Sequence, residues 1–220
     1  MTHFQPGFFD FLAELKENNS KEWFQANKDR YRKDVQEPLL AFISAFAEPL
    51  RSISPHFVAD PRPSGGSMFR IYRDVRFSRD KSPYKVHAAA QFRHREGRDV
   101  HAPGFYLHLE PGNVFMGSGL WHPDGPTLNA IRSAIVEDPA RWREVSEGLE
   151  LGGESLKRGP RGIDPDHPLI DDLKRKDFVC FVNTSQAAAC RRGFLDSFIA
   201  SCRSASPFVE FLTKAVDLEF

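Results

Sequence analysis

Residues 105–121 read Phe-Tyr-Leu-His-Leu-Glu-Pro-Gly-Asn-Val-Phe-Met-Gly-Ser-Gly-Leu-Trp. Apolar residues at 105, 107 and 109 alternate with polar residues at 106, 108 and 110, a period of two that predicts a strand over 105–110. Pro111-Gly112-Asn113 is typical of a hairpin turn, and a second strand is expected over 114–121. A connection this short joins antiparallel neighbours, so the stretch predicts an antiparallel sheet.

The period of two extends to both sides of this hairpin. Residues 68–77 and roughly 84–94 alternate in the same way and are expected to be strands, and Asp177–Val182 predicts a fifth. In 68–77 the alternation puts Phe69, Ile71, Val75 and Phe77 on the core side. The segment 150–168 is rich in Gly, Pro and charge and predicts a long ordered loop.

Apolar residues recur every three or four positions before residue 60 and after residue 124. Helices are expected over 7–18, from about residue 19 to the fifties, and over 125–137, 139–148, 185–202 and 206–216. Asn19 and Glu22 have capping-box spacing at the second start, and Pro38 predicts a kink near Glu37. The expected class is α+β, with an antiparallel meander of about five strands flanked by N-terminal and C-terminal helices.

The composition excludes several classes of protein. Thirty Lys and Arg balance thirty Asp and Glu, and 40% of the residues are hydrophobic, which is typical of a globular chain. No apolar run has the length of a membrane span, and residues 1–6 do not resemble a secretory signal. Three cysteines within the last 41 residues match no zinc motif and are expected as reduced thiols, so a cytoplasmic location is predicted.

The neutral total hides a basic cluster. Residues 70–98 contain nine Lys and Arg against three acidic residues. Clustered cations raise the local concentration of phosphate- or carboxylate-bearing ligands, so we predict an anion site. The alternative is a solvated sheet face whose charges pair with the acidic segment 99–150.

The densest part of this cluster is the loop 78–85, where hydroxyls, lysines and backbone N–H groups can hold an oxyanion. The polar sides of the neighbouring strands, with small residues at 88–90 and 117–119, can form a pocket above the sheet. The predicted ligand-binding residues are therefore Arg70, Arg73, Arg76, Ser78, Lys81, Ser82, Tyr84, Lys85, His87, Tyr106 and His108. The alternative for the loop is a salt-bridged turn in which Asp80 pairs with Lys81 or Arg79 and caps its own backbone. The parity of Arg73 points to the core side.

Motifs for defined chemistry are absent from the sequence. His87, His108 and His122, with Asp74 or Glu110, lack the spacing of metal ligands, and no metal is expected. No nucleophile elbow, dinucleotide fingerprint or Walker loop occurs, so the cofactor is unknown. Trp121-His122-Pro123 is consistent with the edge of a ligand cleft or with a hydrophobic plug.

Residues 68–87, Met-Phe-Arg-Ile-Tyr-Arg-Asp-Val-Arg-Phe-Ser-Arg-Asp-Lys-Ser-Pro-Tyr-Lys-Val-His, resemble the signature of a family of uncharacterised bacterial proteins, domain of unknown function 2461. Residues 7–12, 23–24, 104–112 and 172–178 resemble its other blocks. The resemblance covers nearly the whole chain and implies one family-length unit. We therefore expect a single domain over 1–220, with a helical part at 1–59, a sheet core at 67–121 and a helical part at 125–220. The resemblance to this family implies no particular reaction.

Three functions are compatible with these features. The first is a binder of an anionic small molecule or nucleotide through the basic sheet face. The second is a phosphate-ester hydrolase or transferase in which His87 or His108 acts with Asp74 or Glu110. The third is a protein-interaction scaffold. A nucleic-acid surface is a weaker expectation because the net charge is zero; no membrane contact is expected, and the oligomeric state stays open.

Overall fold

The computed structural model describes residues 2–97 and 102–220, and within them five strands form one sheet. The strand order is β1-β2-β3-β5-β4, and every neighbouring pair is antiparallel. The strands are β1 (Ala88–Arg93), β2 (Gly104–Glu110), β3 (Asn113–Leu120), β4 (Leu151–Gly152) and β5 (Phe178–Thr184). The α+β class and an antiparallel sheet of five strands are confirmed; β1, β2 and β3 follow one another as in a meander, whereas β5 lies between β3 and β4. The short strand β4 lies inside the segment for which the sequence predicts a loop.

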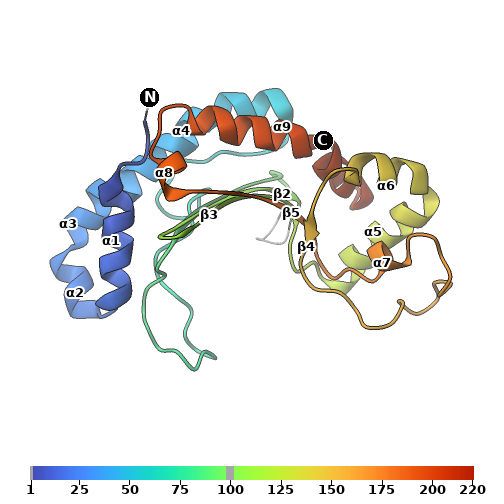
Figure 1. Ribbon diagram of the computed structural model, residues 1–220, viewed down its shortest axis with the longest axis horizontal. Coiled ribbons are helices and arrows are strands. Elements are labelled where there is room, and N and C mark those ends of the chain that lie inside the picture. Colours follow the sequence, from blue (N-terminus) through green and yellow to red (C-terminus); the bar gives the residue numbers. More distant parts are fainter. Residues whose placement is uncertain (1, 98–101) are drawn as a thin grey trace.

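The alternation in β2 is also confirmed. Phe105, Leu107 and Leu109 are fully buried on one face of the sheet. That face is covered by two long helices, α4 (Glu37–Ile53) on β1 and α9 (Phe194–Ala215) on β3 (Figure 1). The other residues of β2 point to the opposite face, which we call the open face. The pleat therefore separates an apolar core face from a face that carries Tyr106 and His108.

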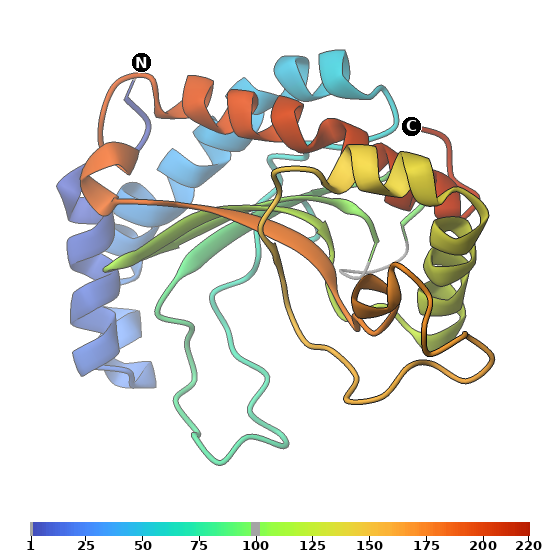
Figure 2. The same ribbon diagram turned by 45° about the vertical axis from the view of Figure 1, so that its right-hand side comes forward.

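The strand predicted over 68–77 is wrong. Residues 69–86 form an irregular arm that projects beyond the sheet on the side away from α4 and α9 (Figures 1 and 2). An isolated bridge between Tyr72 and Tyr84 connects its two sides instead of a regular ladder. The carboxylates of Asp74 and Asp80 accept hydrogen bonds from backbone N–H groups two residues further on, at 3.2 and 2.9 Å. Such local turns compete with a regular ladder, and the alternation alone could not outweigh them.

Two consequences follow for the residues of this segment. Phe77 is 96% exposed at the end of the arm, so its predicted place in the core is wrong. The next strand, expected from about residue 84, begins only at Ala88.

The N-terminal helices agree with the sequence pattern apart from one cap. They are α1 (Pro6–Glu17), α2 (Lys21–Ala26), α3 (Lys28–Tyr31), the π-helical segment η1 (Arg32–Gln36) and α4. The π-helical turn ends where Pro38 predicts a kink, because a proline at this point supplies no N–H to the preceding turn. The cap of α2 is Ser20, whose hydroxyl accepts from the Trp23 N–H. The predicted capping box of Asn19 and Glu22 is wrong.

The C-terminal helices differ from the prediction at one end. They are α5 (Gly125–Glu137), α6 (Pro139–Ser146), α7 (Ile170–Leu173), α8 (Gln186–Ala189) and α9. The two terminal helices predicted over 185–202 and 206–216 are replaced by the short α8 and by α9, which continues through Pro207. Proline removes the N–H that would bond the carbonyl of Arg203, and the Ser206 hydroxyl donates to that carbonyl instead, at 2.8 Å. Within the described residues, no helix combines the length and the apolar character that a membrane crossing requires.

Candidate functional site

A cavity of about 520 Å³ lies on the open face of the sheet, and we call it the open-face cavity. Its floor is made by strands β2, β3 and β5, where Tyr106 faces Gly117 and Gly117 faces Phe181 in the register. Because Gly117 has no side chain, space remains above the middle of the sheet. Its walls include residues of the arm and of the segment before β1, namely Phe69, Lys85 and His87.

A chain of polar groups from β2 borders this cavity. The Tyr106 hydroxyl donates to Nδ1 of His108 at 3.0 Å, and Nε2 of His108 donates to Oε2 of Glu110 at 3.2 Å. The Asn113 amide also donates to Glu110, at 3.3 Å. Alternate residues of one strand project from the same face, which is why positions 106, 108 and 110 meet. The chain holds His108 in the tautomer with its hydrogen on Nε2.

Burial keeps the side chains of Tyr106, His108 and His87 neutral near pH 7. Burial lowers the pKa of His108, although the nearby Glu110 acts in the opposite direction. Burial, followed by repulsion from His108, lowers the pKa of His87 to about 4. Burial also raises the pKa of Tyr106 to about 12. The cavity therefore offers neutral donors and acceptors inside a mainly apolar wall.

Aromatic rings form most of that wall. The ring of Phe115 lies 4.6 Å from the His108 imidazole in a stacked arrangement and contacts Phe181 edge-on at 5.3 Å. Phe69 contacts Tyr106 at 6.0 Å, also edge-on. Trp121, 56% exposed, lines the rim, which agrees with a cleft edge at this strand end. A cavity lined by aromatic rings favours a ligand that is itself aromatic and flat.

Among the described residues that line the open-face cavity, Lys85 carries a positive charge. Nζ of Lys85 donates to the Arg70 carbonyl at 2.8 Å and lies 5.5 Å from the centroid of the Phe69 ring. Burial lowers the pKa of Lys85, and the charge of Arg70 lowers it further. The two cations thus make one region of positive potential beside the aromatic wall.

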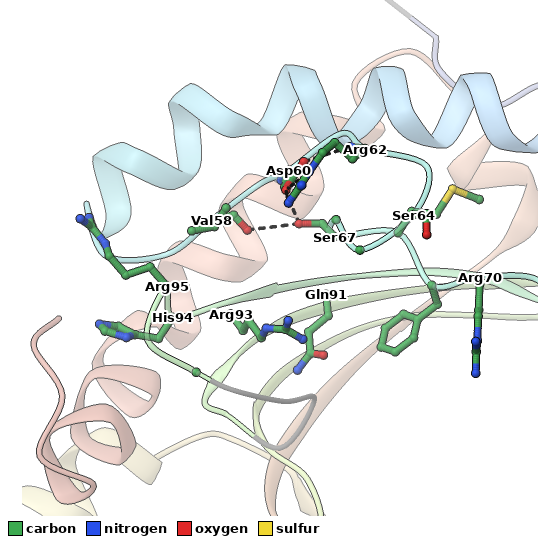
Figure 3. Close-up of a pocket in the computed structure, with 15 residues that line it drawn as sticks. Val58, Asp60, Arg62, Ser64, Ser67, Arg70, Gln91, Arg93, His94 and Arg95 are labelled. Carbon is green, nitrogen blue, oxygen red and sulfur yellow. Dashed lines mark hydrogen bonds and ion pairs between the residues drawn. The ribbon is translucent and has the colours of Figure 1, made fainter. Parts of the chain in front are cut away.

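A second cavity of about 480 Å³ lies at the edge of β1, and we call it the edge cavity (Figure 3). Phe69 and Gln91 line both cavities, so the two adjoin each other. Among the described residues its lining contains four arginines, Arg62, Arg70, Arg93 and Arg95, and one carboxylate, Asp60. In Figure 3 Arg62 lies with Asp60 on one side of β1, whereas Gln91 and Arg70 extend to the other side.

The structure divides the eleven predicted site residues among four places. Lys85, His87, Tyr106 and His108 come together at the open-face cavity. Arg70 lines the edge cavity. Tyr84 is buried in the core and stacks on Phe24, with 4.1 Å between ring centroids. The remaining five lie in the arm and line neither cavity: Arg73, Arg76, Ser78, Lys81 and Ser82. One pocket containing all eleven is not formed.

Most of the polar groups of the arm bind to one another. Arg73 pairs with Asp80, and Arg76 makes a forked contact with Asp74 whose shortest distance is 2.7 Å. The Ser82 hydroxyl donates to Asp80 at 2.6 Å, and Lys81 donates to the Val75 carbonyl at 2.9 Å. The contact with Arg76 lowers the pKa of Asp74 to about 2. The arm thus forms a salt-bridged turn around Asp80, the alternative to an anion-binding loop. The partner of Asp80 is Arg73, whereas the sequence pointed to Lys81 or Arg79.

Several residues of the site were missed by sequence reasoning. They are the aromatic residues Phe69, Phe115 and Phe181. Gln91 and Arg93 line the cavities from positions that alternation places on the polar face of the sheet. Phe115 lies two residues before Gly117 in the same strand, so alternation places both on the open face of the sheet. This pattern is the signal in the sequence that could have identified Phe115. Asp74 and His122, which the sequence also offers as metal donors, have other partners than the cavity histidines. Asp74 pairs with Arg76, and Nδ1 of His122 lies 3.6 Å from the Asp177 carboxylate.

The fold and the cavity define an α+β protein that carries an aromatic-lined pocket on the open face of an antiparallel sheet. Residues 7–211 match the family described as Conserved hypothetical protein (DUF2461), and the chain belongs to this family. The expected family is therefore confirmed. Comparison with curated proteins yields no match.

Proposed function

We propose that this protein binds a small anionic molecule with a planar ring in the open-face cavity. The observation that carries the proposal is the position of Lys85, which lines a cavity walled by aromatic side chains and whose ammonium lies 5.5 Å from the centroid of the Phe69 ring. The rings of Phe115 and Phe181 offer apolar surface to a flat molecule. The ammonium supplies the counter-charge for an acidic substituent, since a charge at a partly dry rim interacts more strongly than one in water.

The neutral side chains of Tyr106 and His108 support selection of the ring by hydrogen bonding. The Tyr106 oxygen, whose hydrogen is donated to His108, keeps lone pairs that can accept a hydrogen bond from a donor on the ring. His87, whose ring centroid lies 4.5 Å from that of His108, adds a second neutral imidazole. The open-face cavity therefore suits a heterocyclic or hydroxylated ring better than a plain hydrocarbon.

Binding can be tested with one ring in three forms: 1-naphthol, 1-naphthoate and 1-naphthyl phosphate, each titrated calorimetrically. We expect the two anions to bind, and Lys85→Met to weaken them about tenfold, which corresponds to one charge-assisted contact. Gly117→Val should abolish binding of all three compounds by filling the cavity. A Cβ at this position meets the Phe181 ring at 3.4 Å and Tyr106 Cβ at 3.5 Å, so the strand tolerates it.

The matched control is Gly7→Val. A Cβ added at Gly7 meets nothing within 4 Å, and Gly7 does not line the open-face cavity. This variant should bind like the wild type. Absence of binding by all three compounds, or equal binding by the Gly117→Val variant, would contradict the proposal.

A second candidate function is phosphate-ester hydrolysis, and the Tyr106–His108–Glu110 chain favours it. In this proposal water attacks phosphorus and gives its proton to the Tyr106 oxygen, while Tyr106 passes its own proton to Nδ1 of His108 and Glu110 stabilises the imidazolium that forms. The P–O bond to the ester oxygen breaks, and the alcohol leaves with a proton that His108 returns. Release of nitrophenol from p-nitrophenyl phosphate is the measurement. Activity that His108→Gln removes and Gly117→Val also removes would support it, whereas equal rates in both variants and the wild type would contradict it.

A further inference from the structure

We infer that the ligand carries a phosphate group, held by Arg70 and Arg93 at the edge of β1 while its ring occupies the open-face cavity. This inference rests on the proposed function and names the class of ligand: a phosphorylated ring compound such as a nucleoside monophosphate. It joins the two cavities into one site with an apolar part and a basic part.

The first support is the contact between the cavities. Phe69 and Gln91 line both of them, so a ligand about the size of a nucleotide can reach from one to the other past these two side chains. The register brings Gln91 opposite Tyr106 and Arg93 opposite Gly104. Alternation along β1 puts Arg93 on the same face as Gln91 and Tyr106, and its side chain lines the edge cavity.

The second support is the distribution of charge around the edge cavity. Arg62 is neutralised by Asp60, to which it donates from Nε at 2.7 Å, and Arg95 donates to the Pro55 carbonyl. Arg70 and Arg93 form no ion pair with any residue in the ranges 2–97 and 102–220. Two guanidinium groups without a carboxylate partner, beside Lys85, leave this corner of the molecule with an excess of positive charge.

The third support is the chemistry of the guanidinium group. Its planar fork of N–H donors matches two oxygens of a phosphate, and a phosphate monoester carries a charge between −1.5 and −2 near pH 7. Two guanidinium groups match that charge and its several oxygens better than they match a carboxylate.

The experiment compares each phosphate with its dephosphorylated partner. Adenosine and adenosine 5′-monophosphate form one pair, and 1-naphthol and 1-naphthyl phosphate form the other, with 1-naphthoate as the carboxylate reference. We expect the phosphate of at least one pair to bind about tenfold or more tighter than its partner, and 1-naphthyl phosphate to bind tighter than 1-naphthoate. Arg70→Gln and Arg93→Gln should each remove most of this advantage. Arg93→Lys should recover only part of it, because lysine lacks the forked donors.

The matched control is Arg79→Gln, which removes the same charge from a residue that lines neither cavity. It should keep the phosphate advantage, and thermal melting should show that all four variants are folded. If the compounds bind, and Gly117→Val prevents it, but the phosphate has no advantage or both glutamine variants keep it, this inference is overturned and the proposed function stands. If no compound binds in a manner that Gly117→Val prevents, the proposed function fails and this inference fails with it.

Discussion

The imidazole of His108 lies parallel to the ring of Phe115, with 4.6 Å between the centroids and 11° between the planes. The two residues face each other across β2 and β3. Phe115 therefore covers one face of a histidine whose edge atoms are bonded to Tyr106 and Glu110. This contact is part of the burial that lowers the pKa of His108, and it links the aromatic wall of the cavity to its polar chain.

The histidines of the cavity predict a pH dependence of stability. The pKa of His87 is about 4 in the folded protein, against 6.5 for an exposed histidine. Between these values the unfolded state binds more protons, so the free energy of unfolding falls as the pH decreases from about 6.5 to about 4. One such group contributes a slope of at most about 1.4 kcal/mol per pH unit.

Urea titrations at several pH values measure this slope. The His87→Gln variant should show a shallower decrease than the wild type between pH 6.5 and 4.5. NMR should place the titration midpoint of the His87 ring near pH 4. A midpoint near 6.5, with identical slopes for both proteins, would show that His87 is not desolvated.

The exposed ring of Phe77 predicts a substitution without effect on stability. Phe77→Ala should change the free energy of unfolding by less than about 0.5 kcal/mol, because the side chain is 96% exposed at the end of the arm. Phe92→Ala is the matched control: Phe92 is fully buried on the core face of β1, and its truncation should cost about 3–5 kcal/mol. A large loss at Phe77 would mean that its ring packs in the core, as the alternation predicts.

Asn19 anchors the arm to the turn before α2. Its amide donates to the Tyr84 carbonyl and accepts from the Tyr84 N–H, both at 3.0 Å. Asn19→Ala should cost about 1–3 kcal/mol, because two backbone groups lose their partner. Trypsin should then cut the arm faster at its basic residues. The neighbouring Asn18→Ala, which loses an exposed bond to the Glu14 carbonyl, is the control and should leave the cleavage rate unchanged.

Asp177 joins three segments of the chain. Its buried carboxylate accepts from the backbone N–H of His122 at 2.7 Å and from that of Glu154 at 2.8 Å. Asp177→Ala should cost about 2–4 kcal/mol in chemical unfolding, because both donors lose their acceptor. Asp171→Ala removes a carboxylate that is 93% exposed and should change stability by less than about 0.5 kcal/mol. Equal effects of the two substitutions would contradict this role.

Features that depend on neighbouring residues can be predicted from the sequence of this chain. The period of two in 105–120 specified two strands and a turn, and it also determined that Tyr106, His108 and Glu110 share a face, because alternation is a local property of an extended chain. The same reasoning failed for 68–77. There the side chains of Asp74 and Asp80 bond to nearby backbone N–H groups, and this local chemistry replaces a ladder that alternation alone would favour.

Which distant residues meet depends on the packing of the folded chain. The pairing of β5 with β3 brings Phe181 opposite Gly117, more than sixty residues away in the chain, and completes the wall of the open-face cavity. The arm returns over the edge of β1 and adds Phe69, Lys85 and Arg70 to the site. α9 continues through Pro207 because its apolar side stays packed on the sheet while the hydroxyl of Ser206 bonds the carbonyl that proline leaves free. These outcomes depend on packing between segments far apart in the chain, which no local period encodes.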